Sequence, residues 1–467
     1  MTRSKFASCA IASAVLLAAA PLVRAARPHY GGTLVMQTTG VMRSLDPVSS
    51  ADEAARARIL SLIFEGLVRV DGAGLQPQLA SSWEHDARAS RWRFTIRSSV
   101  VLHDGSVLDA TRVASLLSVR ERQWKVNGDG NTVIIDLDRP DVDLPWILAD
   151  APHAIALGTG EGSLVGSGPF VVEGIDATRI LLRAHDNYWG GRPFVDAVRI
   201  EQGRPPREQL QALESGRIDM ALIGPTDVRR VVDRGRRVTA SRALTLYALV
   251  FEPHRSQSND DDARAALAAS IDRSTLATVL LQRQALPADG LLPEWISGYG
   301  MLLHDRPLPP PQRRVERPLI LRIDAGDAIA RALAERIAVD AHERGLDVTP
   351  QVAGSGLTPR PDVRLVRVRI EPTTPDRALA SVMQQIGARA IHLVTTEQPP
   401  SGGTPIEDVF RFERTLLRYN IIVPVVHVAD VYGLGDRLES WNEPPVSPTG
   451  AWNLAAVWLR SDRSGSR

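Results

Sequence analysis

Residues 92–113, WRFTIRSSVVLHDGSVLDATRV, combine an alternating strand pattern with a turn and the start of a helix. Trp92, Phe94 and Ile96 fall on one face of the expected strand, because successive side chains of a strand point to opposite sides. An Asp-Gly turn follows, and Asp109 then stands where its carboxylate can cap the next helix. The stretch therefore predicts a half-buried strand that leads through a turn into a helix.

His103 and Asp104 at this turn raise a second possibility, which is half of a catalytic or metal site. Such a site needs further histidine or carboxylate groups, and the neighbouring sequence supplies no second cluster. A turn needs only the Asp-Gly pair itself. We therefore expect His103 and Asp104 to have a structural role.

The composition is that of a globular protein of two or three domains, with 467 residues, of which 44% are hydrophobic and 23% charged. Lys and Arg number 55 and Asp and Glu 54, so the formal net charge is +1. So small a charge provides no general field that attracts nucleic acid or an anionic membrane surface. We expect neither as a partner.

The first 25 residues resemble an export signal. Arg3 and Lys5 form a basic start, a run rich in Ala and Leu follows, and small residues end the segment near Ala25. A membrane anchor is the alternative, but the run is rich in Ala and Ser and ends at Pro21. We expect cleavage near Ala25, and no later stretch is long and apolar enough to cross a bilayer.

Cys9 is the chain's only cysteine, and it lies near the start of this signal. A lipid-anchoring cysteine follows the apolar run, so we expect no lipidation. The mature chain then lacks a disulfide, a thiolate metal site and a cysteine nucleophile. These features predict a periplasmic protein.

Several further motifs lie in order along the first two thirds of the chain: GGTLV (31–35), SLDP (44–47), GSGPFVV (166–172), HDNYWGGRP (185–193), LESGRIDMAL (213–222) and DDARAALAASIDR (261–273). Together with residues 92–113, this succession resembles the family 5 extracytoplasmic solute-binding proteins of ABC importers, which include the oligopeptide-, dipeptide- and nickel-binding proteins. The resemblance extends from about residue 31 to 293. The last third matches poorly, although 327–345 reads as an amphipathic helix and 364–370 as a strand.

The resemblance implies an α/β fold of the periplasmic binding protein type II-like class, with two lobes around a cleft and an extra inserted subdomain. The chain would cross between the lobes near Phe251 and Glu439, and ligand would stabilise the closed form by touching both lobes. The implied segments are 31–48, 166–250 and 440–467 for lobe I (domain Ia), 49–165 for the inserted domain Ib, and 251–439 for lobe II.

Peptide-binding members of the family carry an aromatic-plus-Asp segment in lobe II, whose carboxylate holds the peptide's amino terminus. The corresponding stretch here, 366–383, has no aromatic residue. Alternation places Arg367, Arg369 and Glu371 on one face, and Glu371 is a candidate to replace the missing acid. If this face lines the cleft, the arginines favour an anionic or zwitterionic ligand. If it faces solvent, the arginines indicate nothing about the ligand.

Six further residues are candidate ligand contacts by analogy with the family's fold. The hydroxyls at the end of the first strand could donate hydrogen bonds, and the others flank the expected crossings between the lobes. For each, a surface or core role remains the alternative. These residues are Thr38, Thr39, Tyr247, Glu252, His427 and Tyr432.

The sequence contains none of the patterns GxSxG, HExxH or GxxxxGK[ST], so it predicts no catalytic residue, no metal site and no cofactor. The resemblance implies a monomeric receptor that captures a peptide or similar small solute and delivers it to an inner-membrane ABC permease with a cytoplasmic ATPase. The alternative is a divergent member that no longer feeds a transporter and acts as a sensory or scaffold protein. The short last third and the missing aromatic-Asp segment motivate that alternative.

Overall fold

The computed structural model describes residues 27–47, 53–72, 74–158, 164–252, 260–304, 318–354, 360–392 and 394–460. The predicted signal and Cys9 lie outside these residues. None of the described helices is both long enough and apolar enough to cross a bilayer.

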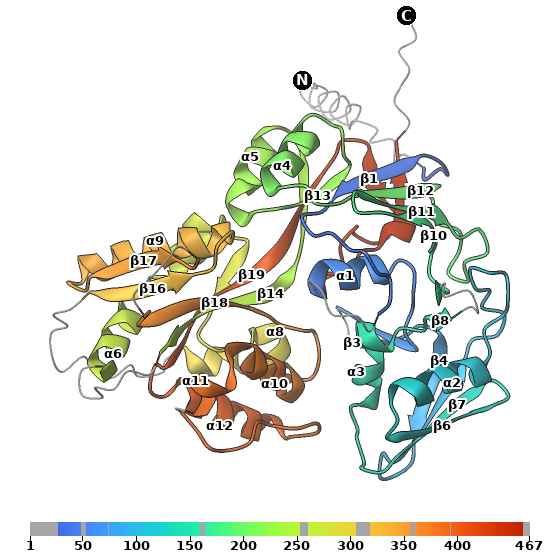
Figure 1. Ribbon diagram of the computed structural model, residues 1–467, viewed down its shortest axis with the longest axis horizontal. Coiled ribbons are helices and arrows are strands. Elements are labelled where there is room, and N and C mark those ends of the chain that lie inside the picture. Colours follow the sequence, from blue (N-terminus) through green and yellow to red (C-terminus); the bar gives the residue numbers. More distant parts are fainter. Residues whose placement is uncertain are drawn as a thin grey trace, which may run out of the picture.

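A mixed sheet of eleven strands runs through the described chain (Figure 1). Its order is β10-β11-β12-β1-β13-β19-β14-β18-β16-β17, with β15 added beside β19. The bounds are β10 Phe170–Ile175, β11 Arg179–Ala184, β12 Ala197–Glu201, β1 Thr33–Gln37, β13 Met220–Ile223, β19 Ile422–Leu434, β14 Arg237–Phe251, β18 Val363–Arg369, β16 Leu319–Ile323, β17 Val348–Val352 and β15 Ala285–Pro287.

The two longest strands, β14 and β19, join the two ends of this sheet. They pair antiparallel from Arg237 opposite Leu434 to Val250 opposite Ile422, with register shifts around Ala243. The last residues of β19 also pair with β13, whereas the second half of β14 pairs with β18. We call β10, β11, β12, β1 and β13, with the helices packed on them, the β1 part. We call β18, β16, β17 and β15, with the helices packed on them, the β18 part.

Helices cover both faces of each part. In the β1 part, α1 (Glu53–Leu60) packs on one face, with α4 (Pro206–Glu214) and α5 (Val228–Asp233) on the other. In the β18 part, one core includes residues of α6 (Asp260–Ser270) and α9 (Ala328–Glu343). A second core includes residues of α10 (Pro375–Ile386), α11 (Ala388–His392) and α12 (Ile406–Leu417). The two parts therefore have separate hydrophobic cores.

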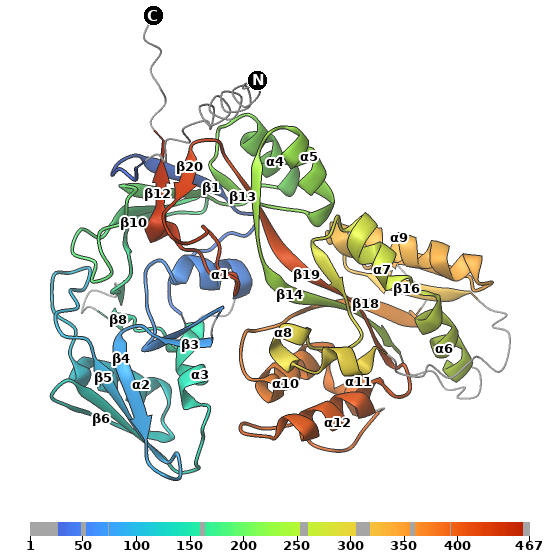
Figure 2. The same cartoon turned by 180° about the vertical axis from the view of Figure 1, so that it is seen from behind.

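A smaller unit carries its own antiparallel sheet, β4-β5-β7-β6, and its own core. We call it the four-stranded unit. Figures 1 and 2 show it on the same side of β14 and β19 as α10 and α12, facing those helices. Its elements are β4 (Ala80–His85), β5 (Arg91–Ile96), β6 (Trp124–Asp129), β7 (Thr132–Leu137), α2 (Ala110–Arg120) and α3 (Leu144–Ala149).

Short elements complete the described chain. Two-stranded sheets are formed by β2 (Val68–Asp71) with β3 (Gly74–Pro77), β8 (Leu157–Gly158) with β9 (Leu164–Val165), and β20 (Leu438–Ser440) with β21 (Val457–Leu459). The remaining helical pieces are α7 (Arg273–Thr275), α8 (Glu294–Ser297), η1 (Ala151–His153), η2 (Pro225–Asp227), η3 (Leu276–Leu280), η4 (Gly300–Leu303) and η5 (Leu454–Ala456).

The strand, turn and helix predicted from residues 92–113 are confirmed. Trp92, Phe94 and Ile96 are buried in the core of the four-stranded unit. Asp109 caps α2, and its carboxylate accepts a hydrogen bond of 2.8 Å from the backbone N–H of Arg112. The predicted alternation of buried and exposed side chains in the strand and the predicted cap of the helix are therefore both present.

His103 has the structural role expected for it. Its Nε2 hydrogen-bonds the Gly168 carbonyl at 3.0 Å, and its ring packs edge-on against His185. Burial is the main cause that lowers the pKa of His103 to about 4, and the carbonyl opposes that shift. The neutral imidazole therefore ties the turn to the loop before β10.

The helix α1 ends at Leu60, although apolar residues continue at helical spacing to Leu67. Beyond it, the carbonyls of Leu62 and Ile63 accept hydrogen bonds from the backbone N–H groups of Phe170 and Gly168. The apolar side chains after Leu60 are still buried. Pairing with the distant 168–170 segment therefore replaces further helical turns.

Candidate functional site

Asp430 of β19 lies where the β1 part meets the β18 part, between two arginines. Arg58 of α1 contacts it through Nη2 and Oδ2 at 2.5 Å, and Arg58 Nε also donates to the Gly450 carbonyl. Arg369, at the end of β18, donates through Nη1 to both carboxylate oxygens at 3.0 and 2.8 Å. One carboxylate thus connects α1 with β18 through the joining strand.

Several arginines surround the single carboxylate of Asp430. Its burial raises the pKa of the carboxyl, but Arg58, Arg369 and the nearby Arg367 outweigh burial, so the pKa lies below its usual value. Three guanidinium groups therefore act on one carboxylate. An anionic group of a ligand is favoured near these arginines.

The alternation predicted for the end of β18 is present. Val368 and Ile370 are buried, whereas Arg367 and Glu371 are exposed and Arg369 is half-buried. Arg367 stands opposite Tyr247 in the register of β14 and β18. Arg369 ends at Asp430, so this face is directed toward the junction of the two parts; contact with a ligand stays a prediction.

A second polar contact joins the four-stranded unit to the β18 part. Arg377, in the first turn of α10, donates through Nη2 to Asp141 at 2.8 and 3.0 Å, and its Nε reaches Asp143 at 3.3 Å. The backbone N–H of Gly403 also donates to Asp143. Both acids stand at the start of α3, so this contact bridges segments more than two hundred positions apart.

Asp150, at the other end of α3, also faces the β18 part. It keeps an exposed surface, although protein atoms crowd around its carboxyl. This desolvation, together with the negative charge of Glu371, raises the pKa of Asp150 to about 7, while Arg377 opposes the shift. The carboxyl is therefore accessible, and its negative charge is poorly compensated.

The remaining sequence candidates are engaged in hydrogen bonds or ion pairs within the protein. The Thr38 hydroxyl donates to the Gly40 carbonyl, and Gln209 Nε2 donates to the Thr39 hydroxyl. Glu252 pairs with Arg364 at 2.6 Å. These contacts favour the structural alternative that the sequence left open for these residues.

The other three candidates are buried. Tyr247 donates to Asp327, the residue that caps α9. His427 Nε2 hydrogen-bonds the Leu291 carbonyl at 3.2 Å, and burial is the main cause that lowers its pKa to about 4. Tyr432 lies under the guanidinium of Arg58, beside the Asp430 cluster. Of the candidates, Arg367, Arg369 and Tyr432 are therefore brought together, and their role in binding stays a prediction.

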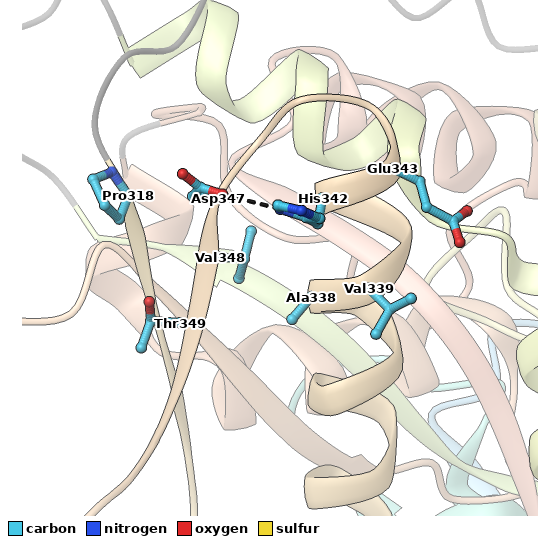
Figure 3. Close-up of a pocket in the computed structure, with 8 residues that line it drawn as sticks. All are labelled: Pro318, Ala338, Val339, His342, Glu343, Asp347, Val348 and Thr349. Atoms are coloured by element: carbon cyan, nitrogen blue, oxygen red, sulfur yellow. Dashed lines mark hydrogen bonds and ion pairs between the residues drawn. The ribbon is translucent and has the colours of Figure 1, made fainter.

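The groove shown in Figure 3 lies elsewhere. It has a volume of about 660 Å³, runs between α9 and the edge strand β17, and includes a contact of 3.2 Å between His342 and Asp347. All its lining residues belong to the β18 part. The groove lies within the β18 part and not between the two parts of the sheet, so it is not the candidate site.

Comparisons with known proteins agree with the sequence motifs. The family model of the bacterial extracellular solute-binding proteins, family 5 (middle), matches residues 74–307, which are 234 of the 467 residues. Protein XP55 of Streptomyces lividans is 28% identical over 261 residues, covering 50% of this chain and 48% of that protein.

Two further relatives differ in the function that their names state. The HTH-type transcriptional regulator SgrR of Pectobacterium atrosepticum is 32% identical over 175 residues, which are 34% of this chain and 31% of the regulator. The peptide transport periplasmic protein SapA of Salmonella typhimurium is 24% identical over 333 residues, which are 61% of this chain and 60% of SapA. The matches thus span less than two thirds of each relative.

Solved structures share the fold over nearly the whole chain. An ABC transporter substrate-binding protein from Sinorhizobium meliloti has a TM-score of 0.69 at 19% identity, covering 92% of this chain and 100% of its own. The oligopeptide-binding protein AppA of Bacillus subtilis, in complex with a nonapeptide, has a TM-score of 0.67 at 16% identity, covering 93% and 100%. The predicted periplasmic binding protein fold is therefore confirmed, and the chain belongs to the bacterial extracellular solute-binding proteins of family 5.

Proposed function

We propose that the protein is the periplasmic substrate-binding component of an ABC importer, which captures a peptide or a similar small solute and delivers it to a membrane permease. The observation that carries the proposal is the paired strands β14 and β19, of which β19 continues to β13 of the β1 part and β14 continues to β18 of the β18 part. Such a two-strand joint allows two lobes to close on a ligand without breaking either core.

The separate hydrophobic cores of the β1 part, the four-stranded unit and the β18 part support the division into domains expected from the sequence. The β1 part corresponds to lobe I, the four-stranded unit to the inserted domain Ib, and the β18 part to lobe II. In this proposal lobe I takes residues 31–48, 166–250 and 440–467, domain Ib takes 49–165 and lobe II takes 251–439, although α1 of the 49–165 segment packs in the core of the β1 part. The change of strand partners occurs inside β14 and β19, and the joint therefore lies within them.

The charges near the joint support a polar ligand. Arg367 and Arg369 favour a carboxylate or another anionic group, because arginine binds planar oxyanions through two parallel hydrogen bonds. A peptide carries such a group at its carboxyl terminus. The names of SapA and AppA, which refer to peptide transport and to a bound nonapeptide, support a peptide as the first class to test.

The proposal includes export and a binding role without catalysis. The predicted signal at residues 1–25 supports a periplasmic location, and the family supports work with an inner-membrane permease and its cytoplasmic ATPase. A monomer is sufficient, because one chain supplies both lobes. No nucleic acid is required for this role.

Thermal unfolding of the exported chain against di- to pentapeptides, amino-acid derivatives, metal chelates and oligosaccharides tests the proposal. Ligand that binds the native state raises the midpoint, and a hundredfold excess over Kd adds about 2.7 kcal/mol of stability. A rise with one class identifies the cargo. No rise with any class contradicts a receptor for these solutes.

A regulatory or sensory role is the second candidate, and the match to the regulator SgrR favours it. A solute-binding domain can serve a sensor by the same closure, with a signalling partner in place of a permease. Genes for a permease and an ATPase beside this gene, together with lost solute uptake on deletion, support transport. Unchanged uptake in the deletion strain supports the regulatory role.

A further inference from the structure

A turn of the β18 part contacts the β1 part on the face of the sheet that carries α5. The turn follows η3, whose residues pack in the core with α6 and α9. Gln282 in this turn donates through Nε2 to the Thr226 carbonyl at 2.5 Å, and its Oε1 accepts a hydrogen bond of 2.6 Å from the backbone N–H of Arg229. Thr226 belongs to η2 and Arg229 to α5. One side-chain amide therefore joins the two parts through both its donor and its acceptor.

The backbone of this turn has a conformation that residues with a Cβ rarely adopt. Gln282 and Arg283 have φ angles of 50° and 63°, and among the described residues other than glycine they are the only two consecutive ones with positive φ. The left-handed region costs free energy, so the surrounding structure must hold it. Leu276 and Leu281 are fully buried beside the turn, and the backbone N–H of Arg283 donates to the Ala277 carbonyl at 3.0 Å. The core of the β18 part thus fixes the backbone from which Gln282 reaches the β1 part.

The same turn is attached to the joint itself. The Gln284 carbonyl accepts a hydrogen bond of 3.0 Å from the backbone N–H of Ala429 in β19, and Ala285 then pairs with Val428. The register of β14 against β19 shifts on both sides of Ala243, which stands opposite Ala429. Gln282 therefore bridges the two parts at the place where the joining strands pair irregularly.

The Gln282 contact and the Asp430 cluster lie on opposite faces of the joint. Ala429 packs against the core that α4 and α5 cover, whereas Asp430, the next residue, bonds Arg58 of α1. Figure 1 shows α5 and α9 on one side of β14 and β19, and the four-stranded unit with α10 and α12 on the other. A rotation about the joint that moves the four-stranded unit toward α10 and α12 therefore moves α5 away from Gln282.

We propose that Gln282 is a positioning residue that opposes closure of the lobes from behind the joint. Its two hydrogen bonds hold the β1 part and the β18 part at one angle, and closure on a solute must break them. Arg377 acts in the opposite direction, because it bonds Asp141 of the four-stranded unit on the cleft side. The inference rests on the proposed function and adds a control on the affinity of the same site. Since the Gln282 bonds stabilise only the open form, they lower the affinity for a solute that binds the closed form.

Spin-label distances in the ligand-free chain test this inference without a known solute. Labels on Val119→Cys of α2 and Arg411→Cys of α12, both exposed, report the approach of the four-stranded unit to the β18 part in the chain without residues 1–25. We expect Gln282→Ala to shift the distance distribution to shorter values. Gln284→Ala is the matched control, because the Gln284 amide bonds the Gln282 carbonyl within the same turn. Its distance distribution should equal that of the wild type.

Calorimetry with an equimolar pool of tripeptides gives the second readout. Gln282→Ala should bind the pool about three- to tenfold more tightly than the wild type, as the loss of one or two hydrogen bonds from the open form allows. Gln282→Glu keeps the acceptor for the Arg229 N–H and loses the donor to Thr226, so its gain in affinity should be smaller. A purely structural role of Gln282 would lower the unfolding midpoint of Gln282→Ala without raising its affinity.

The outcomes separate the two proposals. Unchanged ligand-free distances in Gln282→Ala, or an affinity at or below that of the wild type, overturns this role of Gln282 and leaves the receptor proposal intact. If the pool does not bind to the wild type, the peptide receptor fails, and the ligand-free distances alone decide the role of Gln282. If circular dichroism shows that Gln282→Ala does not fold, Gln282→Glu decides by the same two readouts.

Discussion

Arg58 of α1 and Asp430 of β19 form a buried ion pair at the joint of the molecule, with Nη2 and Oδ2 at 2.5 Å. Asp430 also binds Arg369 of β18, so the two arginines share one carboxylate. Arg58 lies 372 positions from Asp430 in the chain, and Arg369 lies 61 positions from it. Any rotation of the β18 part against α1 must therefore stretch or remake these bonds.

Asp430→Asn should destabilise the protein by about 3 to 5 kcal/mol, because it leaves two guanidinium groups without their shared counter-charge. Urea unfolding of the chain without residues 1–25 measures this change. The exposed Lys125–Asp138 pair provides the control, and Asp138→Asn should cost less than about 1 kcal/mol. A loss below about 1 kcal/mol for Asp430→Asn would show that the buried cluster does not stabilise the joint.

Arg377→Gln should loosen the contact between the four-stranded unit and the β18 part. The side chain bonds Asp141 and Asp143 across the two units, so its loss removes attraction and leaves like charges facing each other. We expect a larger radius of gyration by small-angle X-ray scattering in the absence of ligand. Arg91→Gln, which breaks the Arg91–Asp136 pair within one sheet, should leave it unchanged; an equal effect of both changes would contradict the bridging role.

The raised pKa of Asp150 predicts a pH dependence. Its pKa of about 7 lies above the value in the unfolded chain, so the folded state binds the proton more tightly and loses stability as pH rises from about 4 to 7. Glu371 and Arg377 are the charged groups that face it. Asp150→Asn should therefore be more stable than the wild type at pH 8 by about 1 kcal/mol, after allowance for solvent screening.

At pH 4 the two proteins should have nearly equal stability, because Asp150 is then protonated in the wild type as well. Urea unfolding at both pH values makes the comparison. A stability difference that is the same at pH 4 and pH 8 would mean that titration of Asp150 is not its cause.

Glu65 joins the segment after α1 to residues of the 167–189 segment. Its buried carboxylate accepts hydrogen bonds of 2.8 Å from Ser167, Tyr188 and Trp189, and burial raises its pKa. Glu65→Ala should cost about 3 kcal/mol in unfolding free energy, since it leaves these donors unsatisfied. Glu65→Gln keeps an acceptor and should cost less; equal losses would rule out the hydrogen-bond explanation.

Local sequence was sufficient where short-range chemistry decides the structure. The strand through Trp92 and Phe94, the cap at Asp109 and the helix predicted at 327–345, which the structure forms as α9 (Ala328–Glu343), depend on periodicity and capping within a few residues. The end of α1 at Leu60 could not be predicted in this way. It depends on hydrogen bonds to Gly168 and Phe170, about a hundred positions away.

The candidate site was predicted only in part for the same reason. Arg367, Arg369 and Glu371 follow from strand alternation and from the resemblance to the family. Arg58 and Asp430 carry no motif, and Arg58 meets Asp430 only when the fold brings positions 372 apart together. The pKa of Asp150 is likewise raised by burial in the folded protein and, to a lesser extent, by Glu371 of another unit, and neither can be read from the local sequence.

Closure on a solute should bring the four-stranded unit and the β18 part closer together, and a distance measurement between them detects this movement. Val119 on α2 and Arg411 on α12 are exposed, and Cys9 in the predicted signal is the chain's only cysteine. Spin labels on Val119→Cys and Arg411→Cys therefore report the separation of the four-stranded unit and the β18 part by pulsed EPR. We expect the distance distribution to shift to shorter values when a peptide that raises the unfolding midpoint is added. An unchanged distribution at saturating peptide would contradict closure.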